Sequence, residues 1–225
     1  MKLKYFGHSA FQIKSGKHSI LIDPFLDDNP VSKTKSNQVD ADFIVLTHAH
    51  GDHLGDALKI AKRCNSLFIT VNELAEWLKS KGMKAHNMHI GGSHQFDFGR
   101  VKFTIAHHGS VTPDGQYAGE PAGVVLTIEG KNIYHTGDTG LFYDMKLIGE
   151  MNNPIEYMLC PIGDNFTMGI NDAVKAVELV QPRNVVPMHY NTFGIIQADP
   201  LEFQKKVSEK GFNCRIMNFG EEIEI

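Results

Sequence analysis

Three imidazoles and one carboxylate lie within six residues, directly after an apolar run at 43–47. A continuous apolar and β-branched run of this length predicts a buried strand. His48 and His50 are two residues apart, so in an extended segment both rings point to the same side, and Gly51 lets the chain bend after them. Nitrogen and oxygen donors this close together predict a divalent metal site rather than a solvated loop. The four donors are His48, His50, Asp52 and His53.

Further donors follow other predicted strands. A pair of histidines, His107 and His108, comes after a strand at 101–106, and His189 comes after one at 185–188. Asp138, in the phrase Gly-Asp-Thr-Gly at 137–140, follows the segment 133–136. Functional side chains often stand on such strand-end loops. Together with the first cluster, these residues predict a larger metal site.

The remaining elements alternate between short strands and helices. Before the first cluster we expect strands at 3–6, 10–13 and 19–22; after it, helices at 56–63 and 73–81, the second capped by Asn72, and a strand at 67–70. Further along we expect strands at 95–98, 101–106, 123–129, 132–135, 157–161, 184–188, 214–218 and 222–225, and helices at 141–150, 172–180 (capped by Asn171) and 201–210. Both halves are rich in β-strand and each is followed by helix, which predicts two β-sheet layers with helices outside. Because neither half holds a complete site, we expect a single domain over residues 1–225.

Composition restricts the partners. The chain has 225 residues, 42% of them hydrophobic and 21% charged, as in an ordinary globular protein. Its formal net charge of −4 and the absence of a basic stripe argue against a nucleic-acid partner. We expect a small-molecule substrate, while the formation of a homo-oligomer stays open.

The cysteines and the N-terminus predict a cytoplasmic protein. Cys64, Cys160 and Cys214 are odd in number and widely spaced, which indicates reduced thiols. The N-terminal residues have no signal-peptide pattern, and no apolar run is long enough to span a bilayer. We therefore expect no membrane partner.

Several phrases around the donors carry a resemblance to a known family. They are Gly-His-Ser-Ala-Phe at 7–11, Leu-Ile-Asp-Pro-Phe at 21–25, Tyr-His-Thr-Gly-Asp-Thr-Gly at 134–140, Pro-Ile-Gly-Asp at 161–164 and Val-Pro-Met-His-Tyr at 186–190. With the His-x-His-x-Asp-His motif, they resemble the metallo-β-lactamase superfamily. The match covers essentially the whole chain. Within the superfamily, the chain resembles the branch of small prokaryotic metal-dependent hydrolases of undefined substrate. That branch is related to ascorbate-phosphate lactonases and N-acyl-phosphatidylethanolamine phospholipase D.

The resemblance implies a fold and a ligand set. The fold is the α+β, four-layer αββα sandwich with mixed sheets and a site at one edge between them. The first metal would be held by His48, His50 and His108, and the second by Asp52, His53 and His189. Asp138 would bridge both metals. Because neighbouring strand residues point opposite ways, His107 would face a sheet interior or the back of the site.

This ligand set predicts a hydrolase. Two divalent ions can share a hydroxide near neutral pH, and this nucleophile would cleave a small ester, lactone or phosphodiester. Asp52 and Asp138 are the catalytic candidates, Asp52 as a proton shuttle. We expect two Zn²⁺ ions, with Mn²⁺, Fe²⁺ or Ni²⁺ as alternatives. An RNA-processing nuclease of the same superfamily and a non-catalytic metal sensor are the alternative functions.

Other polar and aromatic residues are candidates for supporting the site. Asp23 is either a turn residue before Pro24 or the partner of a ligating histidine, and His8 either contacts substrate or is structural. His135 is expected to support the Asp138 loop. Contacts to substrate are expected from the loops at 111–121, 164–169 and 190–194. Their candidate residues are Asp164, Phe166 and Tyr190, with Met168 and Phe193 completing an apolar wall.

Overall fold

The computed structural model describes every residue from Met1 to Ile225, and the chain divides into two compact units. The first unit consists of Met1–Gly92, Gly109–Pro121 and Asn218–Ile225. The second unit consists of Ser93–His108 and Ala122–Met217. Neither unit is a continuous stretch of chain, so the units are not consecutive domains. The expectation of a single domain over residues 1–225 stays a prediction.

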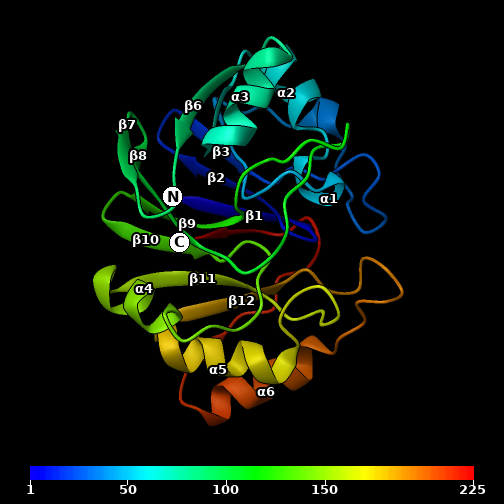
Figure 1. The fold of residues 1–225 in the computed structure, drawn as a ribbon. Helices are drawn as coiled ribbons and strands as arrows, with labels where there is room; N and C mark the ends of the chain where they lie inside the picture. Colours follow the sequence, from blue (N-terminus) through cyan, green and yellow to red (C-terminus); the bar gives the residue numbers. More distant parts are fainter. The chain divides into compact units, whose positions relative to one another are not determined.

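The first unit is built on a seven-stranded mixed sheet (Figure 1). Its strands, in sheet order, are β14 (Glu222–Glu224), β1 (Lys2–Gly7), β2 (Ala10–Ser15), β3 (His18–Ile22), β4 (Phe43–Val45), β5 (Leu67–Val71) and β6 (Lys84–Met88). Neighbouring strands are antiparallel from β14 to β3 and parallel from β3 to β6. Its helices are the 3-10 turn η1 (Ser36–Gln38), α1 (Gly51–Leu54), α2 (Ala57–Cys64) and α3 (Asn72–Ser80), of which α3 packs beside β5 and β6.

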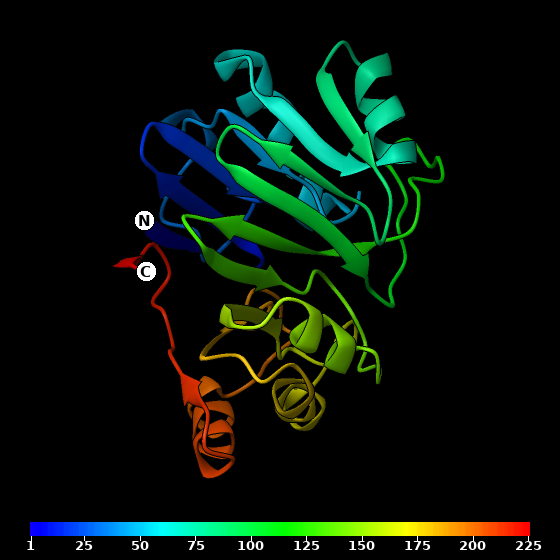
Figure 2. The same cartoon turned by 90° about the vertical axis from the view of Figure 1, so that its left-hand side faces the viewer.

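The second unit repeats this arrangement of an antiparallel part followed by a parallel part. Its strands, in sheet order, are β13 (Asn213–Cys214), β12 (Asn184–Met188), β11 (Ile155–Pro161), β10 (Lys131–His135), β9 (Ala122–Ile128), β8 (Gly99–Ile105) and β7 (Ser93–Phe96). Strands β7 to β10 are antiparallel and β10 to β13 parallel. Its helices are α4 (Met145–Met151), α5 (Ile170–Val180) and α6 (Pro200–Glu209), and Figure 2 shows α5 and α6 end-on, side by side.

Burial explains why these segments became strands and helices. In the first unit, Tyr5 and Phe11 face each other across β1 and β2 and stack at 4.6 Å between ring centroids. In the second unit, the buried faces of α5 and α6 meet the apolar strand β11, with Phe203 and Met158 completely buried. None of the helices is both long and apolar enough to cross a bilayer, and the longest, α5, has 11 residues.

Strand direction brings the predicted donors to particular sheet edges. In the first unit β1, β3 and β4 run in the same direction, so the residues that follow them lie at one edge. In the second unit β8, β10 and β12 also share a direction. The carboxyl ends of such strands are where open sheets place their ligands.

Candidate metal centre

The first unit brings Asp23 to the segment that begins the His-x-His-x-Asp-His motif. Asp23 follows β3, and its backbone N–H donates to Val45 O in the neighbouring strand β4 at 3.1 Å. Two residues after Val45, the Thr47 N–H donates to Asp23 Oδ1 at 2.9 Å. Parallel pairing of β3 with β4 therefore sets the Asp23 carboxylate beside the start of the motif.

Asp23 orients two of the motif's rings. Its side chain is completely buried, and Oδ2 accepts from the Thr47 hydroxyl at 2.6 Å and from His53 Nδ1 at 2.8 Å. Because the Thr47 hydroxyl proton is given to Asp23, its oxygen accepts from His48 Nδ1, 3.0 Å away. Both rings thus use Nδ1 as a donor, which makes Nε2 their ligand atom.

The spacing of the imidazole nitrogens suits a metal ion. His48 Nε2 lies 3.1 Å from His50 Nδ1. Two nitrogens bound to one tetrahedral zinc ion are about 3.3 Å apart, given Zn–N bonds of about 2.0–2.1 Å. The His53 ring centroid lies 4.1 Å from that of His48, which brings a third imidazole to the same place.

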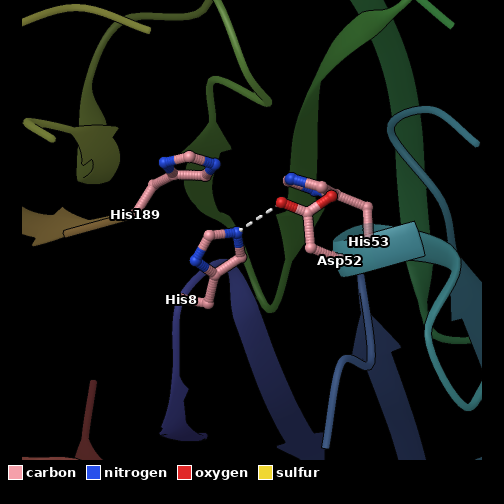
Figure 3. A group of neighbouring side chains, drawn as sticks. All are labelled: His8, Asp52, His53 and His189. Atoms are coloured by element: carbon pink, nitrogen blue, oxygen red, sulfur yellow. Dashed lines mark hydrogen bonds and ion pairs between the residues drawn. The ribbon is translucent and has the colours of Figure 1, made fainter. Parts of the chain in front are cut away.

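His8 supports the motif's carboxylate. His8 Nε2 lies 3.1 Å from Asp52 Oδ2, the contact drawn as a dashed line in Figure 3. Its ring also meets His53 edge-on at 5.5 Å. His8 is completely buried, whereas the Asp52 side chain is 30% exposed. His8 therefore orients Asp52, and the exposed part of that carboxylate can face a substrate.

The second unit gathers its own donors around Asp138. Asp138 Oδ2 lies 3.0 Å from His189 Nε2 and 3.6 Å from His108 Nε2. One carboxylate oxygen between two imidazoles is the arrangement expected of a shared ligand. The loops that carry these residues follow β10, β12 and β8.

Backbone hydrogen bonds hold two of these loops together. The His107 N–H donates to Thr139 Oγ1 at 2.9 Å, and the Gly140 N–H donates to His107 O at 3.1 Å. The Gly137 N–H donates to His135 Nδ1 at 3.1 Å. His135 thus contacts the turn that carries Asp138, in the supporting position expected for it.

Of the two positions expected for His107, a sheet interior is wrong. The His107 side chain is exposed and meets the Phe142 ring edge-on at 5.0 Å. Strand β8 ends at Ile105, so the alternation that would turn His107 inward no longer applies two residues later.

Three site residues have a left-handed backbone. His8, Asp23 and His189 have φ values of 57°, 43° and 53°, and each follows the last residue of a strand. Non-glycine residues rarely adopt this conformation, and those that do are concentrated at functional sites. The backbone thus turns sharply at each strand end and directs the side chain away from the strand.

The donors fit a divalent transition metal by their chemistry. Imidazole nitrogens and carboxylate oxygens are the ligands that zinc and its neighbours prefer. In the first unit, one donor atom from each of Asp23, His48 and His53 lies within 4.8 Å of the others. We assign Asp23 a supporting rather than a ligating position there, because its oxygens already accept three hydrogen bonds.

The residues expected to contact substrate are dispersed. Tyr190 and Met168 are buried in the hydrophobic core of the second unit, so they do not form an exposed wall, and burial raises the pKa of Tyr190 to about 12. Phe166 is 52% exposed. Asp164 is exposed; its carboxylate accepts from the Asn165 N–H and lines a cleft with Asp199.

Two residues of the site were missed from the sequence. Thr47 links Asp23 to His48, and the Ser110 hydroxyl accepts from the Ala49 N–H at 3.3 Å. A hydroxyl residue directly before the motif was the available signal for Thr47. Ser110 had no such signal, because its partner lies 61 residues away.

Comparisons with known proteins agree with this geometry. A family model described as the beta-lactamase superfamily domain matches residues 18–190. The chain is 51% identical over 230 residues to a UPF0173 metal-dependent hydrolase of Bacillus cereus, covering 99% of each chain. A relative of the same description from Bacillus licheniformis is 51% identical over 229 residues, covering 100% of this chain and 99% of the relative. The chain belongs to the UPF0173 metal-dependent hydrolase family of the metallo-β-lactamase superfamily.

A solved structure supports the same assignment. Igni18, described as a novel metallo hydrolase from the hyperthermophilic archaeon Ignicoccus hospitalis, is 41% identical with a TM-score of 0.91. The match covers 100% of this chain and 98% of that chain. The predicted α+β class is confirmed as the metallo-β-lactamase fold, two mixed seven-stranded sheets flanked by helices. Membership of the family implies a divalent metal.

Proposed function

We propose that this chain is a dinuclear metal-dependent hydrolase that cleaves a small ester, lactone or phosphodiester. The observation that supports the proposal is the buried chain of hydrogen bonds from Asp23, which engages Nδ1 of His48 and His53 and leaves Nε2 of each ring as the candidate ligand atom. A solvated histidine-rich loop needs no such relay. Oriented imidazoles with buried hydrogen-bond partners are typical of metal ligands.

The ligand assignment combines donors from both units. We assign His48, His50 and His108 to one metal and Asp52, His53 and His189 to the other. Asp138 is assigned as the ligand common to both. Its position beside His108 and His189 within the second unit supports this role.

The chain's own residues supply orientation and proton transfer. Two divalent ions, when bound, lower the pKa of a water molecule toward neutrality and polarise the carbonyl or phosphoryl oxygen under attack. Asp52 would accept a proton at its carboxylate, with His8 holding Oδ2. Asp23 keeps the ligating rings in one tautomer throughout.

Zinc is the metal we propose, on the strength of the imidazole-rich donor set, with Mn²⁺, Fe²⁺ and Ni²⁺ as the alternatives. A small-molecule substrate is supported by the net charge of −4, which disfavours a phosphate-backbone partner.

A substrate screen with an isosteric variant tests the proposal. The wild-type chain is assayed on phosphodiesters, lactones, thioesters and aryl esters, beside Asp138→Asn. We expect kcat/KM for the active class to fall about a thousandfold or more, equivalent to about 4 kcal/mol of transition-state stabilisation. Elemental analysis of protein purified without added metal is expected to find two equivalents.

The matched control is Asp97→Asn, an exposed aspartate in the turn between β7 and β8, which should retain wild-type activity. Activity that survives Asp138→Asn unchanged would place the chemistry elsewhere. Protein that contains no metal, and gains no activity when any is added, would contradict the hydrolase assignment.

A further inference from the structure

The segment Gly109–Pro121 is tied to the first unit at several points. It begins directly after the ligand candidate His108, and in Figure 2 it is the green stretch that runs beside α3. Val111 pairs with Tyr117 in an isolated β-bridge, and the Thr112 N–H donates to Gln116 O at 2.9 Å. These bonds make the middle of the segment a closed turn.

Asp114 at the tip of this turn fastens it to α3. The Trp77 indole N–H donates to Asp114 Oδ1 at 2.9 Å, with Oδ2 at 3.1 Å, and Lys81 Nζ donates to Oδ2 at 2.9 Å. The Lys81 ammonium also lies 5.0 Å from the centroid of the Trp77 ring. The Thr112 hydroxyl, followed by Lys81 and Trp77, lowers the pKa of Asp114 to about 2, so this carboxylate is charged at neutral pH.

The start of the segment contacts the metal-binding motif. Ser110 Oγ accepts from the N–H of Ala49, the residue between His48 and His50. A side chain at position 109 would meet the His50 ring at 3.9 Å, so the glycine backbone runs close past that ring. The segment thus contacts α3 at its tip and the motif at its start.

The second half of the segment packs tightly as well. Gly119 has a φ of +80°, and a Cβ there would come within 2.5 Å of Glu73 Oε2. Glu73 lies in the first turn of α3. Contacts near both ends of α3 therefore hold the segment in one position.

We propose that Asp114 is a positioning residue for the metal site: by fastening this segment to α3, it holds Ser110 and Gly109 against the His48–His50 segment and restrains the backbone after His108. The inference rests on the proposed function, in which these three histidines are metal ligands. If the tip of the segment is released from α3, the three histidines are held less firmly in their positions. Asp114 itself contacts no substrate or metal. This coupling distinguishes Asp114 from an ordinary surface ion pair, which contributes little.

The first measurement uses Trp77, the only tryptophan of the chain. Its fluorescence is recorded in the full-length protein for wild type, Asp114→Ala, Asp114→Asn and the control Asp97→Asn. We expect Asp114→Ala to increase acrylamide quenching about twofold and to shift the emission to longer wavelength. Asp114→Asn retains an acceptor oxygen for the indole N–H and should lie between Asp114→Ala and wild type. Asp97→Asn should match wild type.

The second measurement follows the metal. Metal-stripped protein is titrated with Zn²⁺ against a chromophoric chelator, and with Co²⁺, whose visible absorption reports ligand geometry. We expect Asp114→Ala to raise the Kd about tenfold, at the lower end of the effect of residues that orient ligands. The Co²⁺ bands should change in Asp114→Ala and recover in part in Asp114→Asn.

The outcomes separate the two proposals. Unchanged Trp77 quenching in Asp114→Ala would show that the fastening does not exist. Changed quenching with a wild-type Kd and Co²⁺ spectrum would reduce Asp114 to a structural role and overturn the inference, while the proposed function would stand. Wild-type protein that binds neither ion would contradict the proposed function and the inference with it.

Discussion

The environment of Asp23 decides between two roles that its sequence position allows equally. A turn aspartate before proline would be solvated, whereas Asp23 is completely buried and accepts three hydrogen bonds from Thr47 and His53. Burial of a carboxylate is costly unless it is hydrogen-bonded throughout. The buried carboxylate is therefore explained by the rings that it orients.

Asp23→Asn should weaken metal binding. The amide keeps the side-chain shape but removes the charge and one acceptor, so the His48 and His53 tautomers are no longer enforced. We expect the Kd for Zn²⁺ to rise about 10- to 100-fold, measured by competition with a chelator. Asp28→Asn is the matched control, because Asp28 is exposed five residues further along the chain. Equal affinities in the two variants would refute the orienting role of Asp23.

At the scale of elements, the hydrophobic pattern predicted which helices and strands are present better than it predicted the residues at which they begin and end. The strand at 184–188 was predicted to the residue, and all five longer helices were anticipated. Strand β6 was missed because only Ala85 and Met88 of its residues are apolar and they are three positions apart, so no apolar alternation marks it. The helix expected at 56–63 is α2, and the short helix α1, which was not predicted, precedes it and carries Asp52 and His53.

Two predicted helix caps were wrong for a common reason. The N-cap positions are Val71 in α3 and Gly169 in α5, rather than Asn72 and Asn171. The Asn72 amide oxygen accepts from Asn87, and that of Asn171 accepts from Lys206. Both asparagine side chains therefore bond to residues distant in the sequence and do not cap their helices, although local propensity favours capping.

Helix α6 has a side-chain cap that can be tested. Asp199 accepts from the Leu201 N–H at 2.9 Å, and Pro200 occupies the first helical turn. We expect Asp199→Ala to lower the free energy of unfolding by about 1 kcal/mol, because one helical N–H loses its partner. Urea unfolding followed by circular dichroism measures the change. Asp199→Asn caps equally well and should stay near wild type; equal loss in both variants would argue against a capping role.

At the scale of the whole molecule, the sequence could predict which residue types gather but not what orients them. The ligand candidates could be selected from the sequence because they follow strands and interrupt apolar runs, a signal that is local in the chain. The relay from Asp23 through Thr47 to His48 joins residues 24 apart, and spacing carries no information about it. The division of the donors between two discontinuous units was equally invisible, because it depends on which strands pair.

Metal binding should raise the free energy of unfolding of the whole chain. Measuring that increase in ligand variants tests whether donors of both units act together. A metal that binds only the folded state adds about 2.7 kcal/mol at one hundred times its Kd, which for a chain of this size raises Tm by roughly 5–10 °C. We expect Zn²⁺ to produce this shift in metal-stripped wild type, measured by scanning calorimetry. If both units supply ligands, His48→Ala and His189→Ala should each remove most of it.

The control for this experiment is His89→Ala, since His89 is exposed and lies outside both donor groups. It should keep the full metal-induced shift, which excludes a general effect of losing one histidine. A full shift in His189→Ala, with its loss in His48→Ala, would mean that the first unit binds the metal alone. The assignment of His108, Asp138 and His189 as ligands would then fail, because a site that depends on both units must lose its stabilising effect when either one is altered.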